Sequence, residues 1–160
     1  MRQSDPVAGL YRTLLIFAAV GMVILAAGLA EFAYFEPVNA SGLHVHIVGV
    51  FHYDPATDQT SGPDEQTFRR ADQFAAVVDW SGLPSTVVVQ ALWFDSFQNI
   101  VGSAGPNVPS EMAGDRSIPA GVPRDLKFHL PGEYIFAVER VVAGQPVEVL
   151  ARRIVEVERT

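Results

Sequence analysis

The sequence predicts a mainly β protein, in which one N-terminal transmembrane α-helix precedes an antiparallel β-sandwich of about seven strands. Three observations lead to this fold class. A run of 18 residues without charge, Thr13 to Ala30, lies near the N-terminus. From Leu43 onward, apolar and polar residues alternate with a period of two. Clusters of Pro and Gly separate the alternating segments, and the 160 residues leave room for one compact domain beyond the helix.

The apolar run predicts a transmembrane helix over residues 13–35, with residues 1–12 as a cytoplasmic N-terminus. At 1.5 Å per residue, the run itself reaches roughly 27 Å, which is close to the hydrocarbon thickness of a bilayer. Arg2 and Arg12 precede it, and no Lys or Arg follows until Arg69. The positive-inside rule therefore places the remainder of the chain outside the cytoplasm. The alternative is a signal peptide cleaved near the end of the run, which leads to the same location for the later residues.

Small residues recur on one face of this predicted helix. At 100° per residue, Ala19, Ala26 and Ala30 fall on a narrow stripe. Because small residues let neighbouring helices approach closely in lipid, the stripe predicts packing against another transmembrane subunit. The alternative interpretation is that Ala is simply common in bacterial membrane helices.

The sandwich is predicted over residues 43–160, after a linker at 36–42 in which Pro, Asn, Ser and Gly cluster. The alternating segments predict strands at 43–51, 74–80, 86–95, 99–101, 126–130, 133–142 and 146–158. In the fifth of these strands, the side chains expected to face the core are Leu126, Phe128 and Leu130.

The segment between residues 102 and 123 is rich in Pro and Gly and shows no alternation. A connection of about 20 residues is long for a compact domain, which is typical of a binding loop or a mobile loop. The residues predicted to contact a partner there are Pro106, Asn107, Met112 and Arg116. Just before this segment, Phe94 and Phe97 flank a predicted turn, where an exposed aromatic side chain would suit a protein interface.

One short motif points to a family. Residues 130–138, with the sequence LPGEYIFAV, resemble a strand that recurs in bacterial immunoglobulin-like and fibronectin type III-like modules. In those modules a Tyr follows a tight turn and begins the penultimate strand. The resemblance covers residues 43–158 at the level of the strand pattern, with Trp93 in the third strand. It implies an immunoglobulin-like sandwich that presents surfaces to partners, although fold does not by itself determine function.

Composition and motifs argue against most catalytic chemistry. The chain has no Cys, which removes disulfides, thiol catalysis and Cys-ligated metal centres. None of the usual hydrolase, zinc-protease, P-loop or dinucleotide-binding motifs is present in the sequence. The net charge of −7 argues against nucleic-acid binding. We therefore expect no enzymatic activity and no cofactor.

The candidate metal ligands are His44 and His46. They lie two residues apart in a predicted strand, so their rings project from the same face. Neutral imidazoles in that arrangement can bind Cu²⁺ or Zn²⁺. His52 has the same parity and joins them unless the strand ends or bulges first. Two alternatives stay open: solvent-facing side chains of an amphipathic strand, and pH-sensitive contacts at a membrane or partner surface.

Together these observations predict a non-catalytic accessory or scaffolding subunit of a larger membrane complex, of respiratory or photosynthetic type. Its partners would be integral membrane subunits and the lipid bilayer. The predicted location is the inner membrane, crossed once, with a cytoplasmic N-terminus and a periplasmic domain. The alternatives are a stand-alone membrane-anchored binding module and a periplasmic metal-binding protein that uses His44 and His46.

Overall fold

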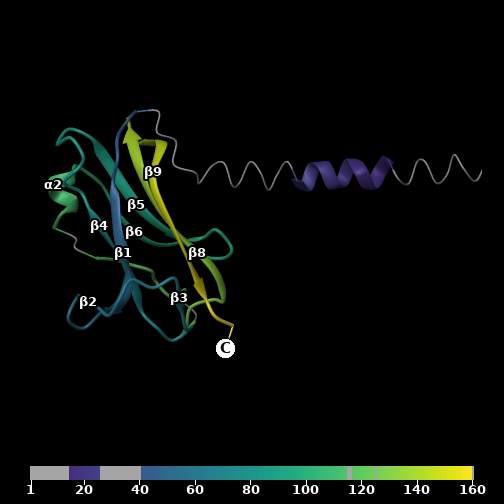
Figure 1. Cartoon of the computed structure of the whole chain (residues 1–160), viewed down its shortest axis with the longest axis horizontal. Coiled ribbons are helices and arrows are strands. Elements are labelled where there is room, and N and C mark those ends of the chain that lie inside the picture. The colour runs from purple at the N-terminus through teal and green to yellow at the C-terminus, as the bar shows by residue number, and fades with distance from the viewer. Residues whose placement is uncertain (1–14, 26–40, 115–116, 125, 160) are drawn as a thin grey trace, which may run out of the picture. The chain divides into compact units, whose positions relative to one another are not determined.

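The computed structural model describes residues 15–25, 41–114, 117–124 and 126–159 (Figure 1). The chain divides into two compact units, Met1–Phe35 and Glu36–Thr160. The first unit contains a helix and the second is mainly β.

The helix of the first unit covers residues 15–25, and its side chains are exposed. In the part of the chain that the structure describes, no helix is long and apolar enough to cross a membrane. The prediction of a transmembrane helix over 13–35 is therefore wrong.

Other predictions for the N-terminal region fall outside the described residues. These are the cytoplasmic segment 1–12 and the linker up to residue 40. The predicted cellular location relied on the same helix, and it stays a prediction.

The second unit contains nine strands in two sheets within the described residues. One sheet has the order β2-β1-β4-β7, formed by Gln59–Ser61, His46–Asp54, Phe74–Asp79 and Ile118–Pro119. The other has the order β3-β9-β8-β5-β6, formed by Thr67–Phe68, Gln145–Val157, Gly132–Val142, Val88–Phe94 and Ile100–Asn107. A short helix, α2 (Pro109–Met112), follows β6. Figure 1 shows the two layers, with β1 and β4 in one and the long hairpin β8–β9 in the other.

Alternation along the strands places one face of each sheet in a shared core. In β5, Val89, Ala91 and Trp93 are fully buried, while the residues between them are partly exposed. Phe74 of β4 and Phe136 of β8 approach the indole of Trp93 from the two sheets, with ring centroids 5.4 and 5.0 Å away. Aromatic packing between the sheets therefore joins the two layers.

The register between β1 and β4 shifts by one residue at Val48, which is the extra residue of a β-bulge. Before the bulge, Val45 and Ile47 pack against the core; after it, Val50 is the buried residue. A bulge exchanges the two faces of a strand because the side-chain period is two. His52 lies beyond the bulge and therefore does not share the face of the histidines before it.

The predicted count of about seven strands is wrong, because three of the observed strands have only two or three residues. β2, β3 and β7 are too short to produce a detectable alternation in the sequence. The segment 102–123, predicted as a loop, also contains regular structure, since β6 continues to Asn107 and both α2 and β7 follow.

The predicted strand at 126–130 is not a strand, and its buried residue is the opposite of the one expected. Leu126 and Phe128 are exposed, whereas His129 is fully buried. The backbone N–H of His129 donates to the carbonyl oxygen of Arg70 at 2.9 Å, and Arg70 Nε donates to the carbonyl oxygen of His129 at 3.0 Å. These bonds hold the segment against the loop that contains Arg70 instead of against a neighbouring strand. As a result, the side chain of His129 faces the core, and those of Leu126 and Phe128 face solvent.

The hydroxyl of Tyr134, near the start of β8, accepts a hydrogen bond from the backbone N–H of Leu130 at 3.0 Å. A Tyr that bonds back to the backbone a few residues upstream is a feature of immunoglobulin-type sandwiches. Burial raises the pKa of Tyr134, so the hydroxyl stays protonated at neutral pH. The resemblance to that family stays a prediction.

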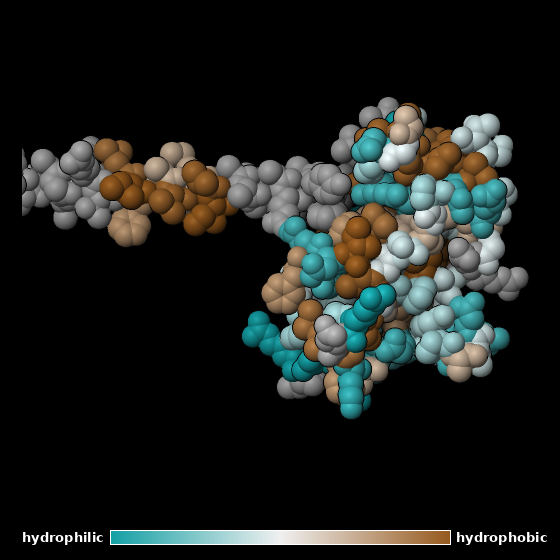
Figure 2. Space-filling model, turned by 180° about the vertical axis from the view of Figure 1, so that it is seen from behind, coloured by the Kyte–Doolittle hydropathy of each residue, from teal (hydrophilic) through white to brown (hydrophobic). Residues whose placement is uncertain are grey.

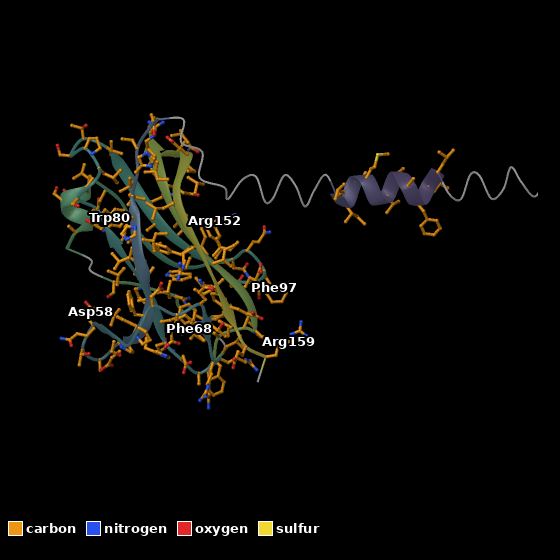
Figure 3. The ribbon with its side chains drawn as sticks, in the orientation of Figure 1. Asp58, Phe68, Trp80, Phe97, Arg152 and Arg159 are labelled. Carbon is orange, nitrogen blue, oxygen red and sulfur yellow. The ribbon has the colours of Figure 1, made fainter. Side chains whose placement is uncertain are left out.

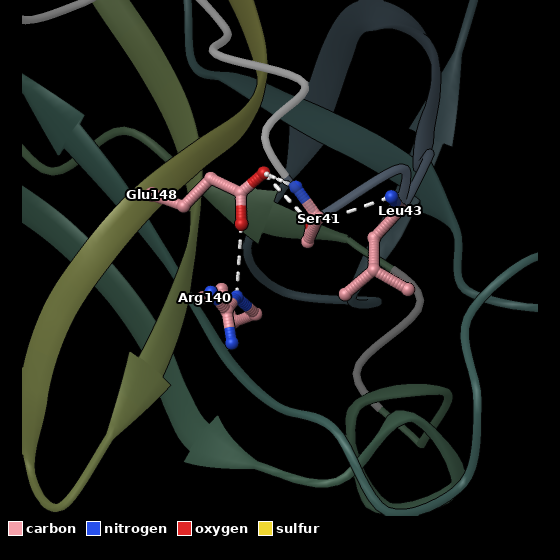
Figure 4. Close-up of polar contacts among 4 residues, drawn as sticks. All are labelled: Ser41, Leu43, Arg140 and Glu148. Carbon is pink, nitrogen blue, oxygen red and sulfur yellow. Dashed lines mark hydrogen bonds and ion pairs between the residues drawn. The ribbon is translucent and has the colours of Figure 1, made fainter.

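A buried carboxylate holds the first described residues of the second unit (Figure 4). Glu148 accepts hydrogen bonds from Ser41 N at 3.1 Å, Ser41 Oγ at 2.8 Å and Arg140 Nε at 2.9 Å. Burial acts to raise the pKa of Glu148, but these hydrogen bonds outweigh it and the pKa is lowered. The carboxylate is therefore charged at neutral pH and connects Ser41 to the hairpin β8–β9.

Candidate functional site

His44 and His46 lie on the exposed side of the chain before the bulge at Val48. His52 lies beyond it, and its ring packs edge-on against Phe68 with the ring centroids 5.4 Å apart. This stretch therefore offers two imidazoles on one face instead of three. Among the described residues, no group of three or more His, Cys, Asp or Glu side chains could hold a metal ion. The metal site at the His pair stays a prediction.

A pocket of about 360 Å³ opens beside His52. Its other lining residues are Glu65, Thr67, Phe68, Arg69, Asp72 and Glu158. His52 Nε2 lies 3.5 Å from Glu65 Oε2. The Asp72 carboxylate accepts a hydrogen bond from Arg69 N at 2.7 Å, which closes the turn between these residues. Three carboxylates beside one guanidinium disfavour an anionic ligand in this pocket.

The residues predicted as a contact loop do not form one surface. Pro106 and Asn107 are exposed at the end of β6, but Met112 is only 1% exposed and belongs to the core. Arg116 lies outside the described residues. Met112 is buried because α2 turns this apolar side chain inward, which the Pro- and Gly-rich composition of the segment did not reveal.

The predicted helix-packing stripe is only partly described. Ala19 lies in the helix over residues 15–25 and is exposed there. Ala26 and Ala30 lie outside the described residues. Packing through this stripe stays a prediction.

A row of apolar side chains crosses the outer face of the five-stranded sheet. Four directly paired residues form it, one from each of β6, β5, β8 and β9: Ile100, Phe94, Ile135 and Ile154. Ile100 is 59% exposed and Ile154 is 37% exposed, while the two residues between them are half-buried. Side chains directly opposite each other on neighbouring strands are in contact, so this apolar row is continuous across the sheet.

Two further side chains enlarge the row. Leu92 lies two residues before Phe94 in β5, so it projects from the same side of the sheet. Phe97 lies in the turn between β5 and β6 and is 70% exposed. It projects from the margin of the sandwich in Figure 3, whereas Phe68 lies in the core. The apolar face is defined as the apolar row together with Leu92 and Phe97. In the space-filling view, apolar surface lies open between polar side chains of the second unit (Figure 2).

The turn that carries Phe97 is held by a buried carboxylate. Asp95 is 3% exposed, and its Oδ1 accepts hydrogen bonds from the backbone N–H groups of Phe97 at 2.8 Å and Asn99 at 2.9 Å. Asn99 Nδ2 also donates to Asp95 Oδ2 at 3.1 Å. The large aromatic ring of Phe97 is therefore presented to solvent by a hydrogen-bonded turn.

Charged residues border the apolar row along β9. Arg152 and Glu156 lie two residues before and two residues after Ile154, on the same side of the strand. Glu133 of β8 lies directly opposite Glu156, and both carboxylates are exposed. The row is thus flanked by a cation on one side and by two anions on the other.

The sequence contains a signal for this face that alternation alone does not reveal. Residues 88–94 and 133–142 are apolar at many positions of both parities, including Leu92, Phe94 and Ile135. A strand that faces solvent on one side normally carries polar residues at alternate positions. An apolar residue at the outward positions therefore indicates either burial on both sides or a contact surface.

Comparison with protein family models, with curated proteins and with solved structures finds no match to this chain. The candidate site therefore depends on geometry. The apolar face is the feature that ordinary solvent-facing surface chemistry does not explain.

Proposed function

We propose that this chain is a non-catalytic interaction module, an accessory subunit that binds another protein chain through the apolar face. The observation that carries this proposal is the apolar row, in which four large side chains from four neighbouring strands are paired on the outside of the sheet. Single exposed apolar residues are ordinary on a protein surface. A contiguous group with a charged border is typical of a protein contact.

Three carboxylates of the second unit support a binding role more than a catalytic one. Asp95 holds a turn, Glu148 holds the chain at Ser41, and Asp72 closes a second turn. A general acid or base needs a carboxylate or imidazole that is held ready for a substrate. These groups are instead occupied by backbone and side-chain donors of the protein itself.

Phe97 has the properties of an anchor residue. Aromatic side chains that can be fully covered by a partner contribute much of the binding free energy of protein interfaces. Phe97 is the most exposed member of the apolar face, at 70%, and lies at the border of the apolar row. Binding through the face would therefore depend strongly on this side chain.

Site-specific photo-crosslinking in cells tests the proposal. A photo-reactive phenylalanine analogue is introduced at position 97 of the full chain, and irradiation is expected to join it covalently to a protein. Position 128 is the matched control, because Phe128 is 48% exposed but lies outside the apolar face. A protein adduct at position 97 and none at position 128 supports the proposal. No adduct at position 97, or equal adducts at both positions, overturns it.

Affinity isolation of tagged full chain gives a second readout. We expect Phe97→Ser to lower the recovery of the bound protein at least about tenfold, because the loss of an aromatic anchor typically weakens binding by 2 kcal/mol or more. Phe128→Ser removes the same chemical group from another part of the surface and is expected to leave recovery unchanged. Equal recovery with both variants would contradict a role for the apolar face.

A further inference from the structure

The charges beside the apolar row are placed with opposite signs on its two sides. On β9, Arg152 precedes Ile154 and Glu156 follows it, each about 7 Å from Ile154 along the strand. Glu133, directly opposite Glu156, adds a second negative charge on the same side. The face therefore has an apolar centre, a positive side and a negative side.

A twofold axis along the apolar row would place the two charges of β9, Arg152 and Glu156, opposite each other, and Glu133 opposite Ala137. Rotation about that axis keeps the position of each strand along the row and reverses direction along the strands. The apolar row of one copy then packs on the apolar row of the other, and Arg152 of each copy faces Glu156 of the other. The strands of the two sheets run roughly aligned, which is one of the two favoured ways for sheets to pack face to face.

We infer that the protein which covers the apolar face is a second copy of this chain, related by this twofold axis. The inference rests on the proposed function, since it names the partner of the same face. A twofold interface uses one patch on both copies, so that patch must be complementary to itself. If all charges beside the apolar row had one sign, they would indicate a partner of the opposite charge. Here Arg152 lies on one side of Ile154 and Glu156 on the other, which is the order of charges that a twofold axis along the row requires.

The other axis that lies in the plane of the face does not give this match. An axis along the strands would place β9 of one copy over β6 of the other. Ser103, Leu92, Ala137 and Arg152 lie in one line across the sheet. Arg152 would then face the hydroxyl of Ser103, and Glu156 would keep no cation opposite to it. The charge pattern therefore selects the axis along the apolar row.

The remaining carboxylate on this side of the sheet does not oppose the arrangement. Glu139 is only 2% exposed, and its Oε2 accepts a hydrogen bond from Gln90 Nε2 at 2.7 Å. Its charge is therefore held below the outermost layer of side chains. Arg152 is partly exposed. The proposed contact between the copies uses its positive charge and does not require its guanidinium group to lack contacts within its own chain.

Charge-reversal variants of the full chain test the dimer. Sedimentation equilibrium measures the self-association of each variant, with the same detergent in every sample. Arg152→Glu and Glu156→Arg are each expected to weaken self-association at least about tenfold, because like charges then face each other at both contacts. An equal mixture of the two variants is expected to associate again. In the mixed pair, positions 152 and 156 of one copy both carry Glu, and those of the other both carry Arg.

Arg124→Glu is the matched control, because Arg124 is exposed, lies outside the apolar face and gives the same change in net charge. It is expected to leave self-association unchanged, and thermal unfolding by circular dichroism checks that each variant folds. A monomeric wild-type chain, single variants that still dimerise, or a mixture that stays dissociated would overturn the dimer. Restoration on mixing cannot result from a merely structural role of either residue.

The mass of the position 97 adduct separates failure of the dimer from failure of the proposed function. A second copy gives an adduct of twice the chain mass of 17.4 kDa. An adduct with a different protein would overturn the dimer and leave the proposed function standing. Absence of any protein adduct would overturn both.

Discussion

The two sheets share one core, but their outer faces differ. On the four-stranded sheet, the polar group of Tyr53 is satisfied, since its hydroxyl donates to Asp58 at 2.9 Å, and Ser117 Oγ lies 3.4 Å from the same carboxylate. On the five-stranded sheet, the outward positions carry the apolar face. The four-stranded sheet exposes a single apolar side chain at its bulge, that of Val48, to 45%, whereas the five-stranded sheet carries large apolar side chains paired across four neighbouring strands. The comparison shows that side chains of the shared inner layer supply most of the free energy of unfolding. The outer face of the five-stranded sheet can therefore carry residues suited to contact with a partner.

The largest expected effect comes from the inner layer of the five-stranded sheet. Phe136 is fully buried, so Phe136→Ala is expected to lower the free energy of unfolding by about 3–5 kcal/mol through lost packing and a residual cavity. Phe97→Ala is expected to change the stability of the monomer by less than about 0.5 kcal/mol, because in the monomer the ring is mostly in water. Urea denaturation followed by tryptophan fluorescence measures both. Similar losses would show that the apolar face is part of the stabilising core.

The buried His129 gives the inner layer a dependence on pH. Burial lowers its pKa from 6.5 to about 4, and neither ring nitrogen has a hydrogen-bond partner among the described residues. Between these two values the unfolded chain binds a proton that the folded chain does not. The stability contribution is thus complete above pH 6.5 and falls as the pH drops toward 4, by about 3 kcal/mol in total.

His129→Leu is the variant that isolates this effect, because it removes the titrating group from a site where the imidazole bonds to none of the residues that the structure describes. Chemical denaturation of both proteins at several pH values between 7 and 4 is the measurement. The difference in stability between variant and wild type is expected to shift in favour of the variant as the pH falls. A difference that is constant over this range would contradict a neutral, buried imidazole.

A smaller effect is expected at the carboxylate beneath Ser41. Glu148→Ala removes the acceptor of Ser41 and of Arg140, and is expected to lower the free energy of unfolding by about 1–3 kcal/mol. Glu158→Ala, just after the same strand and exposed, is the control and is expected to change it by less than about 0.5 kcal/mol. Thermal unfolding of the two variants compares them directly. Equal melting temperatures would show that the Glu148 contacts add no net stability.

The smallest effects are expected on the two outer faces themselves. Tyr53→Phe removes one exposed hydrogen bond and is expected to lower stability by about 0.5 kcal/mol. Ile154→Thr keeps a β-branched residue in the strand and is expected to change the stability of the monomer by less than about 0.5 kcal/mol. Only Ile154→Thr is expected to weaken association in the sedimentation experiment. An equal loss of association with Tyr53→Phe would remove the distinction between the two faces.

Much of the strand pattern can be predicted from local sequence. The alternation at 86–95 and 133–142 places β5 and β8 close to their observed bounds, because both strands are long and cross the centre of a sheet. The exposed face shared by His44 and His46 follows from the same period of two. His129 could not be placed in this way, since its burial depends on bonds to Arg70, distant in the sequence.

The candidate site could be predicted only in part. The turn between Phe94 and Phe97 is visible in the sequence, but the apolar row requires the register of four strands, and register is a property of the folded sheet. The bulge at Val48 is a similar case, because Gly49 beside it is a residue that often marks a bulge, but the residue at which β1 changes face is set by the pairing with β4. Pairing across strands therefore determines both the surface that we propose to be functional and the separation of His52 from the other histidines.

The turn at Asp95 has a consequence for the entropy of association. A flexible loop that becomes fixed on contact loses roughly 1–2 kcal/mol per residue of backbone freedom. Two backbone N–H groups of this turn are already bonded to the Asp95 carboxylate, so that ordering takes place when the chain folds. Capture of Phe97 by a partner would require little further loss of backbone freedom. The strength of binding would then be set by the surface that meets the ring and by how quickly the two molecules encounter each other.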